Sequence, residues 1–140
     1  MIRWLILIFI LVAALPASAH EVRPAYLEVT ETQPQTFEIV WKQPVMGDRR
    51  LVIDPSFPET CATVGNEVIS RQNGTLIRRW AISCDLSNAQ IQIIGLERTL
   101  TDVFARVTFV DGTSRNAMLR PVSPVFDLSS DETDLSLIHI

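Results

Sequence analysis

Alternation of polar and apolar side chains is the feature that most constrains how this chain folds. In residues 36–42, apolar Phe37, Ile39 and Trp41 share one side of the segment, opposite Glu38. A period of two residues is typical of a half-buried β-strand. The same alternation recurs along the chain, and no segment keeps a helical period long enough to matter. The sequence therefore predicts an all-β domain.

Turn residues separate the alternating segments and join some of them in pairs. Asn73-Gly74 and Asp111-Gly112 are each flanked by alternating segments, which is the strongest short-range signal for a β-hairpin. Asn73-Gly74-Thr75 also fits a glycosylation sequon, but a type I′ turn is the preferred interpretation. We expect seven or eight short strands, at residues 25–30, 36–42, 49–53, 67–72, 75–84, 90–94, 102–110 and 114–120, and a proline-punctuated loop at residues 54–58.

So many short strands in about 100 residues favour two packed sheets. We predict a two-sheet antiparallel β-sandwich of immunoglobulin-like type, with a small barrel as the alternative. Trp41 and Trp80 each alternate with apolar residues and are expected in the core. The alternative is that they form an exposed aromatic platform for a sugar or a peptide.

The first 19 residues have the three parts of a cleavable signal peptide. Arg3 supplies the positive charge, residues 4–15 are apolar, and Ala17-Ser18-Ala19 forms a cleavage site of small residues. The apolar run of about a dozen residues is shorter than the roughly 20 that span a bilayer. Cleavage leaves His20 as the first residue; an uncleaved anchor is the alternative.

The remaining chain divides into one domain and a polar tail. Residues 20–124 contain every expected strand and form a single β-sandwich domain. Residues 125–136 are rich in acidic and hydroxyl side chains, so we expect a linker that buries no face. Residues 137–140 turn apolar again, and they are either the start of a membrane segment or a stub packed on the domain.

Two cysteines, Cys61 and Cys84, occur in the whole chain. An even number of cysteines in an exported protein predicts a disulfide, so we expect these two to be joined. A thiolate metal site is disfavoured because it requires closer spacing and further cysteine or histidine ligands.

Charge and residue types argue against two function classes. Beyond the leader, which contains Arg3, the chain has 16 acidic against 11 basic side chains and no basic stripe, so nucleic acid is not an expected partner. The only histidines are His20 and His139, no free thiol is expected, and no glycine-rich phosphate loop is present. We therefore expect no catalytic activity.

His20 is the one candidate metal ligand. As a new N-terminus it offers its α-amino group and an imidazole nitrogen as a chelate for nickel or copper. A complete site needs a further ligand; Glu21 is adjacent and His139 is the only other imidazole. The alternative is a frayed terminus that happens to begin with histidine.

Several short motifs occur in a fixed order along the chain. They are residues 20–28 (HEVRPAYLE), residues 41–44 (WKQP) with Gly47, Leu51 with Asp54-Pro55, Cys61, Trp80 with Cys84, Gly95-Leu96 and Thr101-Asp102-Val103. Over about residues 20–124 this set resembles the extracytoplasmic N-terminal domain of HupE/UreJ-type membrane proteins.

The resemblance implies a membrane domain of several helices, in the same or a separate chain, and a link to nickel or cobalt uptake for hydrogenase and urease. Residues 137–140 are similar to the approach to its first helix. The transport half itself does not follow in this sequence.

Three hypotheses follow. The first is a non-catalytic accessory domain of a HupE/UreJ-type protein that delivers or senses a transition metal, exported to the periplasm and tethered to the inner membrane. The second is a stand-alone periplasmic module that binds a protein or glycan through its loops or a sheet edge. The third, a copper enzyme built on His20, is the weakest because a second imidazole is not nearby in the sequence.

Overall fold

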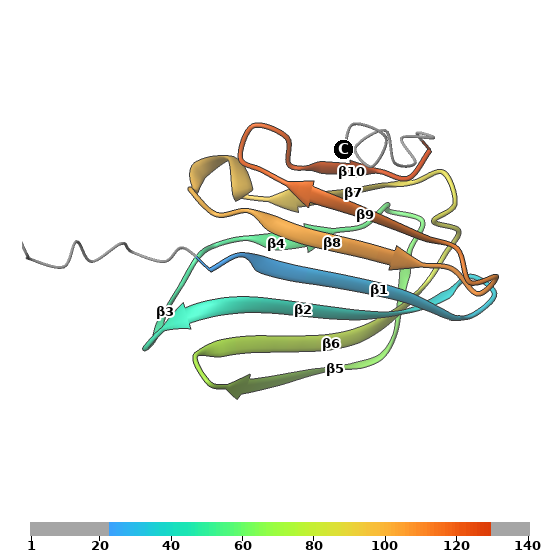
Figure 1. The fold of residues 1–140 in the computed structure, drawn as a ribbon. Coiled ribbons are helices and arrows are strands. Elements are labelled where there is room, and N and C mark those ends of the chain that lie inside the picture. The colour runs from blue at the N-terminus through green and yellow to red at the C-terminus, as the bar shows by residue number, and fades with distance from the viewer. Residues whose placement is uncertain (1–22, 130–140) are drawn as a thin grey trace, which may run out of the picture.

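Ten strands form two facing sheets with a core between them (Figure 1). The computed structural model describes residues 23–129, which contain both sheets and this core; the predicted signal peptide and the end of the predicted linker lie outside the described residues. The elements are β1 (Ala25–Gln33), β2 (Thr36–Met46), β3 (Arg49–Arg50), β4 (Asp54–Ser56), β5 (Ala62–Gln72), β6 (Thr75–Ser83), β7 (Gln90–Ile94), the 3-10 helix η1 (Leu96–Arg98), β8 (Val103–Thr108), β9 (Ser114–Leu119) and β10 (Val125–Asp127).

The predicted two-sheet sandwich is confirmed, with one departure in strand direction. The large sheet has the order β5-β6-β2-β1-β8-β9, with β3 paired to the end of β2, and the small sheet has the order β10-β7-β4. β1 and β8 pair in parallel, from Ala25 opposite Val103 to Thr30 opposite Thr108, whereas the other strand pairs are antiparallel. The expected antiparallel arrangement is therefore wrong at this pair. β8 occupies the free side of β1 and runs in the same direction, and this direction is not encoded by the alternation within either strand. The immunoglobulin-like strand arrangement stays a prediction.

The predicted alternation places the core between the sheets. Leu27 and Val29 of β1 and Ile39 and Trp41 of β2 are fully buried, as are Ile91 and Ile93 of β7 on the facing sheet. Trp41 is therefore a core residue, as expected. Its indole Nε1–H donates to Oε1 of Gln43 at 3.4 Å, and the Gln43 amide donates to the carbonyl of Leu51, so this buried polar side chain fixes the connection that leaves β3.

The two short edge strands of the small sheet were not expected. β4 lies in the predicted loop at residues 54–58, and β10 lies in the predicted linker that begins at residue 125. Both predictions are wrong there: β4 and β10 pair with the two sides of β7, and Phe126 and Leu128 are buried. Three-residue strands are too short to show a periodic pattern, and Pro55 is tolerated because β4 is an edge strand. The domain thus extends to at least Leu128.

The Asn73-Gly74 hairpin forms as predicted. Both residues have a positive φ, 48° at Asn73 and 72° at Gly74, as a type I′ turn requires. The strand before this turn is longer than expected, since β5 begins at Ala62 and contains a bulge between Val64 and Val68.

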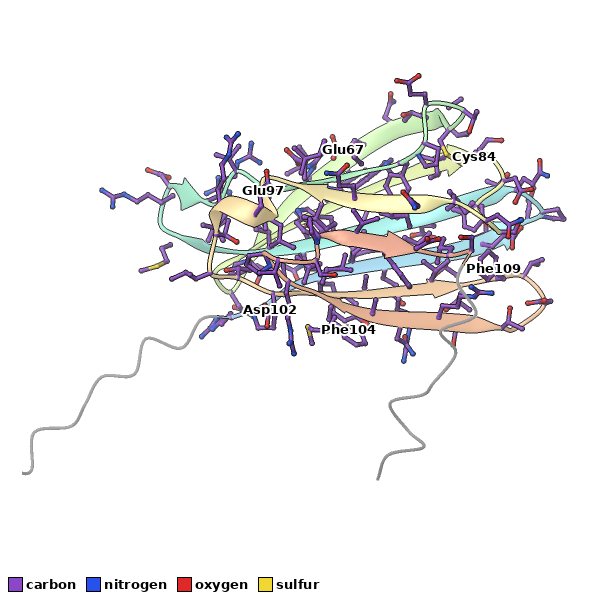
Figure 2. All side chains as sticks on the ribbon, turned by 90° about the horizontal axis from the view of Figure 1, so that it is seen from above. Glu67, Cys84, Glu97, Asp102, Phe104 and Phe109 are labelled. Atoms are coloured by element: carbon purple, nitrogen blue, oxygen red, sulfur yellow. A yellow bond between two sulfur atoms is a disulfide. The ribbon has the colours of Figure 1, made fainter. Side chains whose placement is uncertain are left out.

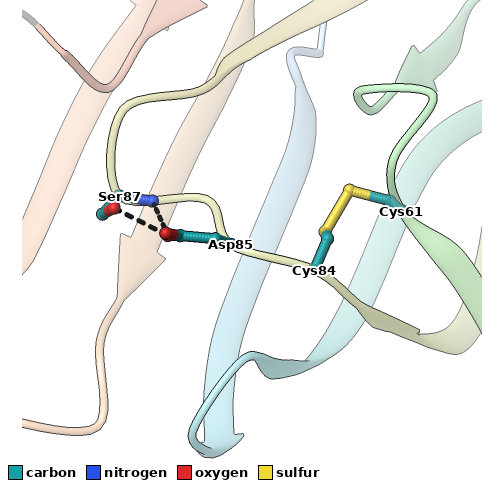
Figure 3. Close-up of a disulfide and its surroundings, with 4 residues drawn as sticks. All are labelled: Cys61, Cys84, Asp85 and Ser87. Atoms are coloured by element: carbon teal, nitrogen blue, oxygen red, sulfur yellow. Dashed lines mark hydrogen bonds between the residues drawn. A yellow bond between two sulfur atoms is a disulfide. The ribbon is translucent and has the colours of Figure 1, made fainter.

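The predicted disulfide between Cys61 and Cys84 is present (Figure 3). The two Cα atoms are 4.7 Å apart, directly beside the paired residues Ala62 of β5 and Ser83 of β6. At Cys61 the chain arrives from the small sheet, and after Cys84 it returns there. The disulfide therefore joins two connections that cross between the sheets.

Replacing both cysteines with alanine should lower the free energy of unfolding by about 3 kcal/mol, because the unfolded chain regains the freedom of the closed loop. Urea unfolding followed by tryptophan fluorescence measures this difference. Reductant should shift the midpoint of the parent protein and leave that of the double variant unchanged. Equal stability of parent and variant would contradict the structural role of the bond.

Candidate functional site

An aromatic pair lies on the solvent face of the large sheet. Tyr26 of β1 is directly opposite Phe104 of β8, and their stacked ring centroids are 5.3 Å apart. On the other side of Tyr26, the Nζ atom of Lys42 lies 5.8 Å from the tyrosine ring centroid, within the range of a cation–π contact. Both rings remain partly exposed because the small sheet covers only the opposite face.

The pair belongs to a row of side chains that crosses the sheet. Met118 of β9 is opposite Phe104, and Ile77 of β6 is opposite Lys42. Met118 is exposed, whereas Ile77 is buried even though it faces outward. The row therefore places four apolar or aromatic side chains and Lys42 next to one another on this solvent face.

A shallow depression of about 370 Å³ opens beside Tyr26. Its size falls within the range of small-ligand sites. It is lined by Arg23, Pro24, Tyr26, Glu28, Lys42, Pro44 and Thr75. These residues, here called the Tyr26 depression, combine two proline rings and an aromatic ring with charges of both signs. Such a lining suits the binding of an extended segment that has apolar and charged groups.

Neither of the two tryptophans considered for an exposed aromatic platform belongs to this pair. Trp41 is buried, so it cannot form an exposed platform. Trp80 is partly buried at the edge of the core, in an edge-to-face contact with Phe57 at 6.3 Å. Tyr26 and Phe104 were recognisable only as aromatic residues on the polar side of their strands, alternating with buried Leu27 and Ala105.

Arg78 of β6 links the large sheet to the small sheet. Its guanidinium contacts Oε1 of Glu67 on β5 and Oδ1 of Asp54 on β4, each at 2.5 Å, and lies 5.2 Å from the ring centroid of Trp80. Burial opposes the charge, but the hydrogen bonds and attraction of the two carboxylates outweigh it and leave the pKa of Arg78 raised. These contacts explain Arg78 as a structural residue.

Of the predicted site residues, the structure describes the two cysteines and not the metal ligands. His20, Glu21 and His139 lie outside the described residues, so the nickel or copper site stays a prediction. Within residues 23–129, no three His, Cys, Asp or Glu side chains come close enough to hold a metal ion together. The same range has no helix that could span a membrane. The Cys61–Cys84 disulfide is consistent with an oxidising compartment outside the cytoplasm.

Comparison of the chain with models of protein families gives no match, and neither do searches of curated proteins and of solved structures.

The Tyr26–Phe104 pair should contribute little to stability compared with a core ring. Phe104→Ala should lower the free energy of unfolding by about 1 kcal/mol, because its ring is already partly solvated. Phe37→Ala, the matched control in the core, should cost about 3–5 kcal/mol. Urea unfolding of both variants tests this difference. A loss at Phe104 as large as that at Phe37 would make the pair part of the folding core.

Proposed function

We propose that this chain is a non-catalytic accessory domain of a HupE/UreJ-type membrane protein, located outside the cytoplasm, and that it binds its partner through the Tyr26 depression. The observation that supports the proposal is that two of the motifs similar to the HupE/UreJ-type family line the Tyr26 depression. Residues 20–28 supply Pro24 and Tyr26 to the lining of the depression, and residues 41–44 supply Lys42 and Pro44.

Within these motifs, residues that point into the core alternate with residues that face the solvent. In the first motif, Ala25 and Leu27 point into the core, and in the second, Trp41 and Gln43 do so. Packing explains these inward residues. The outward residues of the same motifs, including Tyr26, have no such role in the core, which supports a binding function for their face of the sheet.

The partner best suited to this surface is an extended segment of the membrane domain, in the same or a separate chain. The apolar side chains of such a segment would cover the Tyr26 and Phe104 rings, and its polar groups would meet Lys42 and Arg23. Export through the predicted signal peptide would bring the domain to the periplasmic side of the inner membrane, where the disulfide is stable.

In this setting the cargo is a transition metal ion, and His20 is the proposed ligand for it. His20 precedes Arg23 by three residues, which limits its distance from that residue to roughly 10 Å. Arg23 lines the Tyr26 depression. An ion held by the free N-terminus and imidazole of His20 would therefore lie near the partner-binding surface.

Photo-crosslinking in cells tests the partner. With a benzoylphenylalanine in place of Phe104, we expect an ultraviolet-dependent adduct with a HupE/UreJ-type membrane protein, or with a membrane segment of the same protein, identified by mass spectrometry. The same probe at Gln92, exposed on the small sheet, is the matched control. Adducts only with soluble proteins or glycans would favour the stand-alone binding module instead.

Calorimetric titration with nickel and copper tests the metal ligand. Protein that begins at a free His20 should bind one ion, whereas a form with one extra residue before His20 should lose this binding, because its α-amino group no longer completes the chelate. His20→Ala is the second control. Equal binding by all three forms would exclude His20 as the ligand while leaving the proposed partner surface untouched.

A further inference from the structure

Four large apolar side chains are far more exposed than the rest. Met46, Val52, Leu100 and Val122 are between 83% and 91% exposed, whereas the other exposed large apolar side chains of residues 23–129 reach at most 61%. Each of the four lies in or beside a connection between strands, and none of them is packed in the core. A monomeric domain gains nothing in its own stability from four such side chains.

The four residues lie in or beside connections at one end of the sandwich, the end at which β1 begins. The pairing of Tyr26 with Lys42 places the end of β2, and hence Met46, at this end. The parallel pairing of β1 and β8 places Leu100 there, since it comes just before β8, and the β8–β9 hairpin returns the chain to Val122. Val52 joins them because its carbonyl lies against Gly95, between β7 and η1. We call this the N-terminal end; it comprises Arg23 and residues 42–52, 71–76, 95–102 and 120–123, the Asn73-Gly74 turn being placed here by the hydrogen bond from the Val45 amide to the Gly74 carbonyl.

The charges of the domain are separated along the same axis. The N-terminal end has seven cationic side chains against three carboxylates. The rest of residues 23–129 has four cationic side chains against nine carboxylates. The cations of the N-terminal end are Arg23, Lys42, Arg49, Arg50, Arg71, Arg98 and Arg120. Figure 2 labels Glu97 and Asp102 at this end, and Cys84 and Phe109 at the opposite end.

Two turns of the opposite end contain carboxyl groups whose charged form is stabilised by hydrogen bonds. They are those of Asp85 and Asp111, and hydrogen bonds from the hydroxyl and amide groups of Ser87 and Thr113 lower the pKa of these carboxyl groups. A negatively charged surface should therefore attract the N-terminal end and repel the other end.

We infer that the N-terminal end docks on the surface of a lipid bilayer that contains anionic headgroups. The apolar side chains at the loop tips would enter the boundary between headgroups and acyl chains, and the surrounding arginines would contact lipid phosphates. The four side chains project from separate connections rather than forming one pocket. This arrangement favours a bilayer, which accepts scattered apolar groups, over a protein partner, which needs a complementary packed surface.

A tether on the C-terminal side of the domain does not account for this orientation. Ser129 lies at the opposite end, because Asp127 pairs with Gln90 at the start of β7. A tether that follows Ser129 would not by itself bring Leu100 and Val122 to the bilayer. Docking of the N-terminal end is therefore distinguishable from tethering.

Vesicle flotation tests the docking with the chain that begins at His20, which retains both sheets. It should float with vesicles of equal parts phosphatidylglycerol and phosphatidylcholine, and not with phosphatidylcholine alone. The double variant Leu100→Ser/Val122→Ser should lower the apparent affinity about tenfold, because two inserted apolar side chains are lost. The matched control is Val64→Ser/Val68→Ser, which removes two exposed apolar side chains from β5. That control should bind like the parent.

A second pair of variants tests whether the arginines of the N-terminal end contribute to vesicle binding. Arg49→Glu/Arg50→Glu should abolish flotation, whereas Arg79→Glu/Arg106→Glu, on the solvent face of the large sheet, should reduce it much less. A Val122→Trp variant should also be quenched by lipids brominated in their acyl chains. Absence of flotation, equal binding to both kinds of vesicle, or a Leu100→Ser/Val122→Ser variant that binds like the parent would overturn the inference. The crosslinking result at Phe104 is independent of these outcomes.

Discussion

The connections that cross between the two sheets are the constraint on which the rest of this fold depends. The small sheet has only three short strands, so the hydrogen bonds between these strands contribute little to its stability. It is held over the large sheet by the chain segments that enter and leave it. The Cys61–Cys84 bond ties together two of these segments at one end, and Gln43 holds a third through the carbonyl of Leu51 at the other. Covering the large sheet in this way buries Trp41 and leaves the Tyr26 face open.

The two proposed surfaces have different origins in the chain. Most of the Tyr26 depression is built from outward-facing residues of β1, β2 and β6, so these side chains are fixed by the same register that packs the core. The N-terminal end is built mostly from connections, together with strand ends such as that of β2, so fewer of its side chains are fixed by a ladder. The two surfaces share Arg23 and Lys42. A domain docked through its N-terminal end would therefore hold the depression close to the bilayer, within reach of a membrane partner.

Local patterns in the sequence predicted much of the fold, and the failures have a common cause. Alternation located the long strands, Asn73-Gly74 located a hairpin, and the count of cysteines gave the disulfide. β4 and β10 were missed because three residues cannot show a period, and the parallel pairing of β1 with β8 was missed because no local pattern records it. Tyr26 and Phe104 are far apart in sequence, so their pairing depends on that same long-range register. The N-terminal end was missed for the same reason, since its four exposed apolar residues lie in or beside separate connections.

The central position of β1 has a consequence for the time at which the domain can fold. Its first residue, Ala25, pairs with Val103, which is synthesised much later. Until β8 has been synthesised, one side of the first strand lacks its partner and the core lacks the residues of β8 and β9. Contacts between such distant segments form slowly because a long loop must close before they are gained. The chain is thus suited to fold only after nearly all of the domain has been synthesised.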